Sequence, residues 1–252
     1  MPPTIPLHIS VLGLGANVVV CGLLLFGLFQ GLAAADLPQA RKTRFGLIAS
    51  IGIIGWLFVA GELARAGVFE ARIERVFPMI ALGTGLPIVL GLLAIRFSAT
   101  LRAVIDAIPM QRLVGVQVYR TLGFVFLLAY GANLVPGAFA WPAGLGDIAV
   151  GLLAPLVAWR IMKSADGARG TVLAWNLLGI GDLMLAVSLG FLSSPSRFQA
   201  IAFDAPNTMS AYPLVMVPIF AVPVSILLHA AALTKLRAAR RRKAKLGAPA
   251  TA

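Results

Sequence analysis

The sequence predicts an all-α, polytopic integral membrane protein with seven transmembrane helices, its N-terminus outside and its C-terminus in the cytoplasm. Three observations predict this fold. The chain is 60% hydrophobic and only 12% charged, whereas soluble domains carry about 25% charged residues. Its apolar residues fall in runs of about 20, which as helices span a hydrocarbon core of roughly 30 Å. Its cations are concentrated in every second loop between these runs.

The seven predicted helices follow the uncharged runs of the chain in order. The first run is not preceded by Lys or Arg and is longer than the apolar part of a signal peptide. The second lies between Arg44 and Glu62, and the residues after the third form an amphipathic connector at 96–112. The turn into the fifth begins at Pro136-Gly137. The expected ranges are 9–32, 45–61, 76–95, 113–134, 142–161, 171–192 and 211–234.

The orientation follows from the distribution of the 21 Lys and Arg residues. Sixteen of them lie in loops one, three and five and in the C-terminal segment, and four lie in the loops on the other side. Because cytoplasmic loops are enriched in Lys and Arg, the richer side is expected to be cytoplasmic. We therefore expect a transmembrane domain at 1–234 and a basic cytoplasmic tail at 235–252.

Composition also limits the partners of the chain. The basic tail is expected to bind anionic lipids, and the orientation rule accounts for the net charge of +12 without nucleic acid. Cys21 is the single cysteine, and His8 and His229 are expected near opposite ends of the bundle, so we expect no metal and no cofactor. The Ala-, Gly-, Leu- and Arg-rich composition is typical of a plasma membrane protein of the bacterial inner membrane.

Ionisable residues inside predicted helices are the first functional candidates, because a charge at the membrane centre costs about 2.5–3.5 kcal/mol on insertion scales. Asp182 lies near the middle of the sixth helix. Asp147 is expected about five residues into the fifth helix, roughly 7–8 Å from its outer edge. Arg120 lies in the cytoplasmic half of the fourth helix, at a depth that permits an ion pair with Asp182. The alternatives are a protonated, structural Asp and an Arg that reaches interfacial water.

Two further residues are expected to line a polar pathway. Asn176 precedes Asp182 by six residues, although an Asn in a membrane helix also stabilises packing by about 1 kcal/mol. Pro218 is the middle of three prolines spaced by five in the last helix, together with Pro213 and Pro223. Each proline removes a backbone donor, so kinks or unwound turns are expected there.

Both aspartates occur in the same local phrase. Gly144-Leu145-Gly146-Asp147 and Gly179-Ile180-Gly181-Asp182 both read GxGD, and glycine beside each carboxylate leaves space for another helix, a substrate or water. The phrase resembles the GxGD motif of intramembrane aspartyl proteases such as presenilins and preflagellin peptidases. That resemblance implies that Asp147 and Asp182 are a catalytic pair that activates a water molecule.

Three functional hypotheses follow from these residues. The first is a small transporter or channel-like permease for an unidentified solute or ion, with Asp182 as a proton- or cation-responsive group. The second is a GxGD-type hydrolase that uses Asp147 and Asp182. The third is a non-catalytic membrane assembly or receptor-like subunit, in which the acids only specify packing. An enzymatic activity is thus one alternative and not the leading one.

Overall fold

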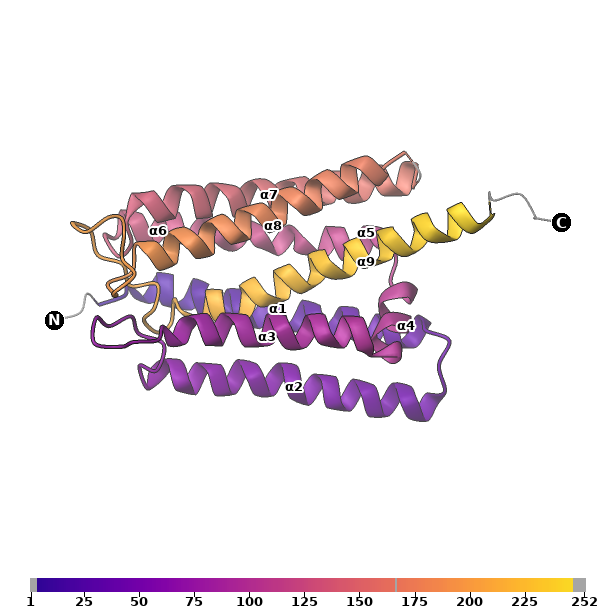
Figure 1. Ribbon diagram of the computed structural model, residues 1–252, viewed down its shortest axis with the longest axis horizontal. Helices are drawn as coiled ribbons and strands as arrows, with labels where there is room; N and C mark the ends of the chain where they lie inside the picture. Colours follow the sequence, from indigo (N-terminus) through magenta and orange to yellow (C-terminus); the bar gives the residue numbers. More distant parts are fainter. Residues whose placement is uncertain (1–3, 166, 247–252) are drawn as a thin grey trace.

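The computed structural model describes residues 4–165 and 167–246, and the regular secondary structure within them is entirely helical. Figure 1 shows an elongated bundle whose main helices run along its long axis, with the two termini at opposite ends. The elements are α1 (Leu7–Ala34), α2 (Gln39–Arg65), α3 (Met79–Phe97), α4 (Ala99–Ala107), α5 (Met110–Gly115), η1 (Val116–Phe124), α6 (Val125–Gly131), α7 (Gly137–Lys163), α8 (Arg169–Leu192), η2 (Val217–Ala221) and α9 (Val222–Leu246).

Seven helical spans among the described residues are long and apolar enough to cross a membrane. They are α1, α2, α3, the run Met110–Gly131, α7, α8 and the run Val217–Arg241. The expectation of seven long apolar helices is therefore confirmed. The amphipathic connector forms the short helix α4, which Ser98 caps by accepting a hydrogen bond from the Leu101 amide at 3.1 Å.

The outer surface of the bundle is apolar. In α2 the buried residues are the small Gly46, Ala60 and Ala64, whereas Ile51 and Phe58 are 63% and 68% exposed. In water such a surface would be a strong liability, because contiguous exposed apolar patches promote association. In a bilayer the same surface has an apolar solvent, and small residues at helix contacts are what close packing there requires.

The fifth span begins earlier than the sequence predicted. α7 starts at Gly137 and not at 142, with Pro136 as its N-cap, so Pro142 lies inside the helix. Asp147 is consequently ten residues from the start of α7, about 15 Å along its axis. The expectation of a shallow Asp147 was wrong, because proline is tolerated inside membrane helices, as Pro155 of α7 also is, and does not have to mark a helix start.

The fourth span is not the continuous α-helix that was expected. It consists of α5, the nine-residue 3₁₀ segment η1 and α6. A Cβ on Gly151 of α7 would lie 2.6 Å from the Thr121 amide nitrogen, so the η1 backbone packs directly against α7. A 3₁₀ run of this length is uncommon and frequently marks a strained or functional segment. Glycine at position 151 allows this close contact between the two helices. The residues of η1 themselves do not indicate it.

The last span also starts later than predicted. Residues 212–215 form turns, η2 is a π-helical turn that contains Pro218, and α9 begins at Val222. The expectation of an unwound turn in this region is confirmed. α9 then continues past 234 to Leu246, so the basic segment begins as an extension of this helix. The end of the predicted tail, from 247 on, lies outside the described residues.

Candidate charged site

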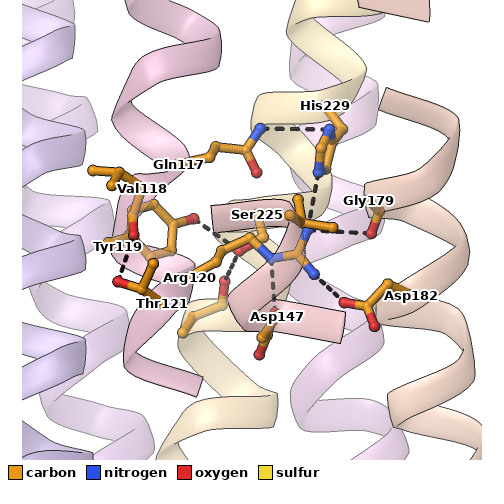
Figure 2. Close-up of polar contacts among 12 residues, drawn as sticks. Gln117, Val118, Tyr119, Arg120, Thr121, Asp147, Gly179, Asp182, Ser225 and His229 are labelled. Atoms are coloured by element: carbon orange, nitrogen blue, oxygen red, sulfur yellow. Dashed lines mark hydrogen bonds and ion pairs between the residues drawn. The ribbon is translucent and has the colours of Figure 1, made fainter. Parts of the chain in front are cut away.

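Arg120 in η1 is a buried cation at the centre of the bundle. Its side chain is 1% exposed, and Figure 2 shows it surrounded by groups from α7, α8 and α9. Its Nε donates to Asp147 Oδ1 at 2.7 Å, and its Nη2 donates to Asp182 Oδ2. Its Nη1 lies 3.2 Å from both the Gly179 carbonyl oxygen and His229 Nε2. All three guanidinium nitrogens thus have partners.

The two aspartates come from neighbouring helices and bind the same guanidinium. Their side chains are 15% exposed for Asp147 and 8% exposed for Asp182. Buried charges are tolerated only when they are paired and hydrogen-bonded. The ion pair between Arg120 and Asp182 was among the expectations from the sequence, whereas Asp147 was expected at another depth.

His229 of α9 completes the site, on the side nearer the end of the bundle at which α9 ends. Asn176 Nδ2 donates to the Val172 carbonyl at 2.7 Å, so its Oδ1 faces His229 Nδ1 at 2.9 Å. An amide oxygen only accepts, which places the ring proton on Nδ1. Nε2 then accepts from Arg120, and the imidazole is neutral. We call Arg120, Asp147, Asp182 and His229 the charged cluster.

The expectation that His229 lies near the inner end of its helix was wrong, because the last span runs from Val217 to Arg241. His229 is 0% exposed and lies seven residues into a helix that continues to Leu246. The Gln117 side-chain amide also lies 3.4 Å from Nδ1, where only an amide oxygen can accept the ring proton. The missed signal was that three apolar spans each contain a polar side chain, Gln117, Asn176 and His229, and that buried polar groups need partners.

Glycines make the space for this cluster. A Cβ on Gly146 of α7 would overlap the Asp182 carboxyl group, and one on Gly123 of η1 would overlap Asp147. A Cβ on Gly179 of α8 would overlap the His229 ring and lie 3.1 Å from Arg120 Nη1. Asp147, Asp182 and His229 can therefore approach Arg120 closely, because each lies against a glycine of a neighbouring helix.

Two cavities adjoin the cluster. The larger one, of about 450 Å³, lies between the N-terminal half of α3 and the C-terminal half of α8. This is the end of the bundle at which α1 begins (Figure 1). The other, of about 40 Å³, is lined by Tyr119, Arg120, Asp147 and Ser225 among others, and it is large enough and polar enough for water. Asp147 lines both cavities, so it connects the cluster with the larger space.

A family model described as a domain of unknown function (DUF8737) matches residues 77–237, more than half of the chain. The chain belongs to the DUF8737 family. The matched segment of this DUF8737 protein contains the whole charged cluster and both cavity-lining helices, α3 and α8. No curated protein and no solved structure matches the chain.

In this DUF8737 chain the five candidate residues from the sequence lie in one region, but they differ in how directly they contact Arg120. Arg120, Asp147 and Asp182 are in direct contact, and Asn176 is joined to them through His229. Pro218 lines the larger cavity, as Asp147 does. The described residues contain no group of three or more His, Cys, Asp or Glu side chains that could hold a metal ion.

Proposed function

We propose that this DUF8737 protein is a small multi-pass membrane transporter whose charge-coupled step takes place at the charged cluster. The observation that supports this function is the sharing of one buried guanidinium by two carboxylates. With neutral His229, one cation and two anions leave the ionised cluster with a surplus of one negative charge. An uncompensated charge is strongly unfavourable in a low-dielectric interior. One proton or one monovalent cation would neutralise it, which is the requirement for coupling a solute to an ion.

The position of the cluster supports the same function. On its N-terminal side lies the cavity of about 450 Å³. On its C-terminal side Val114, Val150 and Trp175 belong to one buried apolar cluster. A site with a cavity on one side and packed apolar side chains on the other is compatible with one state of an alternating-access cycle. The 3₁₀ segment η1 and the π-helical η2 flank the site, as broken helices do in transporters.

The proposed orientation has the open cavity outside and the C-terminal end in the cytoplasm of a bacterial inner membrane. Figure 1 shows that the α1–α2 and α7–α8 connections, α4 and the C-terminus lie at one end of the bundle. Sixteen Lys and Arg residues belong to these segments and to the ends of the adjoining helices. Cytoplasmic loops carry such an excess. The basic end of α9 would then contact anionic lipids.

The geometry supports transport better than peptide hydrolysis. Proximity of Asp147 and Asp182 is common to both hypotheses. A protease pair, however, shares one proton and activates a water molecule between its carboxyl groups. Here Arg120 supplies a fixed counter-charge to both carboxylates. A purely structural role of the cluster would explain neither its surplus negative charge nor the adjoining cavity.

Proton binding by the cluster can be measured as charge displacement. Proteoliposomes of the full chain, adsorbed on a solid-supported membrane, would be exposed to a jump in external pH. The wild type is expected to give a transient current above that of protein-free liposomes. Asp147→Asn and Asp182→Asn should each abolish it, because one carboxylate and one guanidinium leave the cluster neutral. Asp204→Asn, at an exposed loop residue, is the matched control and should retain it.

Two results would contradict the proposed function. One is a wild-type current no larger than that of protein-free liposomes. The other is a transient that persists in both Asp147→Asn and Asp182→Asn, which would leave the cluster a packing role. Cleavage of a membrane-embedded peptide by the wild type, lost in both variants, would instead establish the hydrolase.

A further inference from the structure

The larger cavity has apolar walls. It lies between α3, with Ile80 and Ile88, and α8, with Leu183, and both helices pack against α9. Phe126 and Phe139 lie at its inner part, with ring centroids 5.3 Å apart in an edge-to-face arrangement. A volume of about 450 Å³ is in the usual range for a small organic ligand of about 300–1,000 Å³.

Four charged residues line this cavity, Glu70, Arg72, Arg75 and Asp147. Three of them belong to the α2–α3 loop and have partners there. Arg72 pairs with Glu70 at 2.8 Å. Arg75 donates to the Val68 carbonyl and lies 3.2 Å and 3.3 Å from those of Gly67 and Glu70. These contacts tie the loop charges to the loop itself.

Asp147 is the charged residue at the inner end of the cavity, and it belongs to a cluster with a surplus negative charge. Its Oδ1 accepts from Arg120, and its side chain is 15% exposed. A ligand of this cavity should therefore carry a positive charge, and that charge should lie at the inner end of the cavity, near Asp147. Phe126 and Phe139, which line the same cavity, also favour a cation, because aromatic faces attract positive charge by about 0.5–2 kcal/mol.

We infer that the cavity binds an amphipathic organic monocation, with its charge at Asp147 and its apolar body between α3 and α8. This inference rests on the proposed function and names its substrate class. A divalent inorganic cation fits less well, because Ca²⁺ and Mg²⁺ take about six or more oxygen ligands, and the walls of this cavity are mostly apolar. An anion would meet the surplus negative charge of the cluster.

The same geometry couples the cation to a proton. The cluster needs one positive charge to become neutral, and a proton and an organic cation each supply one. Because both would neutralise Asp147, their binding is mutually exclusive. The smaller cavity beside Tyr119 and Ser225, whose hydroxyl groups lie 2.8 Å apart, provides room for water next to the carboxylate. Exchange of one proton for one organic cation is the stoichiometry that this charge balance implies.

The test uses tetraphenylphosphonium, a permanent monocation, and tetraphenylborate, an anion of nearly the same shape. Binding of radiolabelled tetraphenylphosphonium to the purified full chain in detergent would be followed by a scintillation proximity assay. We expect saturable binding that weakens as the pH falls. Asp147→Asn should weaken it at least tenfold, and tetraphenylborate should compete only by its non-specific partition into detergent, equally in the wild type and in Asp147→Asn.

A matched pair of variants tests the location. Gly85 lines the cavity and Gly52 lies on the exposed side of α2, and a Cβ at either position would meet nothing within 4 Å. Gly85→Phe should fill the cavity and lower the affinity for tetraphenylphosphonium. Gly52→Phe should leave the affinity at the wild-type value.

Three results would overturn the inference: equal affinity in the wild type and Asp147→Asn, equal loss in Gly85→Phe and Gly52→Phe, or binding that does not change with pH. A proton transient without specific tetraphenylphosphonium binding would remove this substrate class and leave the proposed transporter. Specific binding that depends on Asp147, together with an absent transient, would support the site for organic cations and contradict the proton-linked transport cycle.

Discussion

The two GxGD phrases have the same sequence pattern but differ in what their glycines contact. In α7 the glycine before Asp147 is Gly146, and a Cβ there would overlap Asp182 of α8. In α8 the glycine before Asp182 is Gly181, and a Cβ there would meet nothing within 4 Å. The first glycines differ as well. Gly144 lies against Leu127, at 2.9 Å from a Cβ position, whereas Gly179 lies against His229.

The clearest difference lies in the second glycine, which receives a side chain of the neighbouring helix in α7 and faces open space in α8. Gly123 of η1 receives Asp147 of α7, and Gly146 of α7 receives Asp182 of α8. Gly179 of α8 then receives His229 of α9. Each helix thus gives space to a polar side chain of the next one, and Arg120 joins the whole series. Equal motifs do not imply equal roles, which substitutions can test.

Removal of Arg120 should have the largest effect, because it affects both phrases at once. Arg120→Met leaves two buried carboxylates without a counter-charge, and breaking a buried ion pair in this way costs about 3–5 kcal/mol. Cys21 is a buried free cysteine, so a thiol-reactive fluorogenic dye reports unfolding of the chain in detergent as the temperature rises. We expect a large fall in the melting temperature.

The control for this prediction is Arg72→Met. The Arg72–Glu70 pair is exposed on both sides, and such pairs contribute about 0–1 kcal/mol. Combining Arg120→Met with Asp147→Asn and Asp182→Asn removes every charge and should recover part of the lost stability. Equal melting temperatures for Arg120→Met and Arg72→Met would show that the guanidinium does not hold the helices together.

The aspartates should be markedly non-additive. Asp147→Asn or Asp182→Asn alone leaves one carboxylate for Arg120, so each should cost clearly less than the roughly 3–5 kcal/mol of leaving a buried charge unpaired. The double variant leaves Arg120 buried and unpaired. Its loss should exceed the sum of the single losses by about 1–3 kcal/mol, the usual coupling for groups in one network. The same dye assay measures all three variants.

Additive losses would indicate that the two carboxylates do not share the charge of Arg120. A large loss for Asp147→Asn alone would point to a structural role for that carboxylate and not to the ligand-binding role inferred above. Unequal single losses would also sharpen the comparison of the two phrases, since Asp147 is the more exposed of the two.

Much of the architecture was predictable because a membrane helix requires a long, uninterrupted run of apolar residues. Uncharged runs of about 20 residues identify a span even when its ends are uncertain by several residues. The seven helical spans and the amphipathic α4 were found in this way. The ends were less predictable. Pro142 was taken as a helix start, and the real start at Gly137 changed the depth of Asp147 by five residues.

The candidate site was predictable in its charges and not in its connections. Asp147, Asp182 and Arg120 attract attention because ionisable groups are costly in an apolar run. His229 did not, since nothing in its own helix distinguishes a buried imidazole from one at a membrane boundary. Its role depends on Asn176, Gln117 and Arg120 from two other helices. The 3₁₀ segment η1 likewise packs directly against Gly151 of α7, a contact that its own residues do not indicate.

The smallest change tests the comparison of the two phrases most directly. Gly146→Ala and Gly181→Ala add the same methyl group immediately before each aspartate. At Gly146 the methyl group would overlap the Asp182 carboxyl group, and overpacking costs about 1–3 kcal/mol. At Gly181 it enters open space, and alanine in place of a helical glycine stabilises by about 0.5–1 kcal/mol. The melting temperature should therefore fall in Gly146→Ala and stay or rise slightly in Gly181→Ala. A fall of the same size in both would mean that the two phrases are packed alike, and that glycine at each is required by the backbone of its own helix.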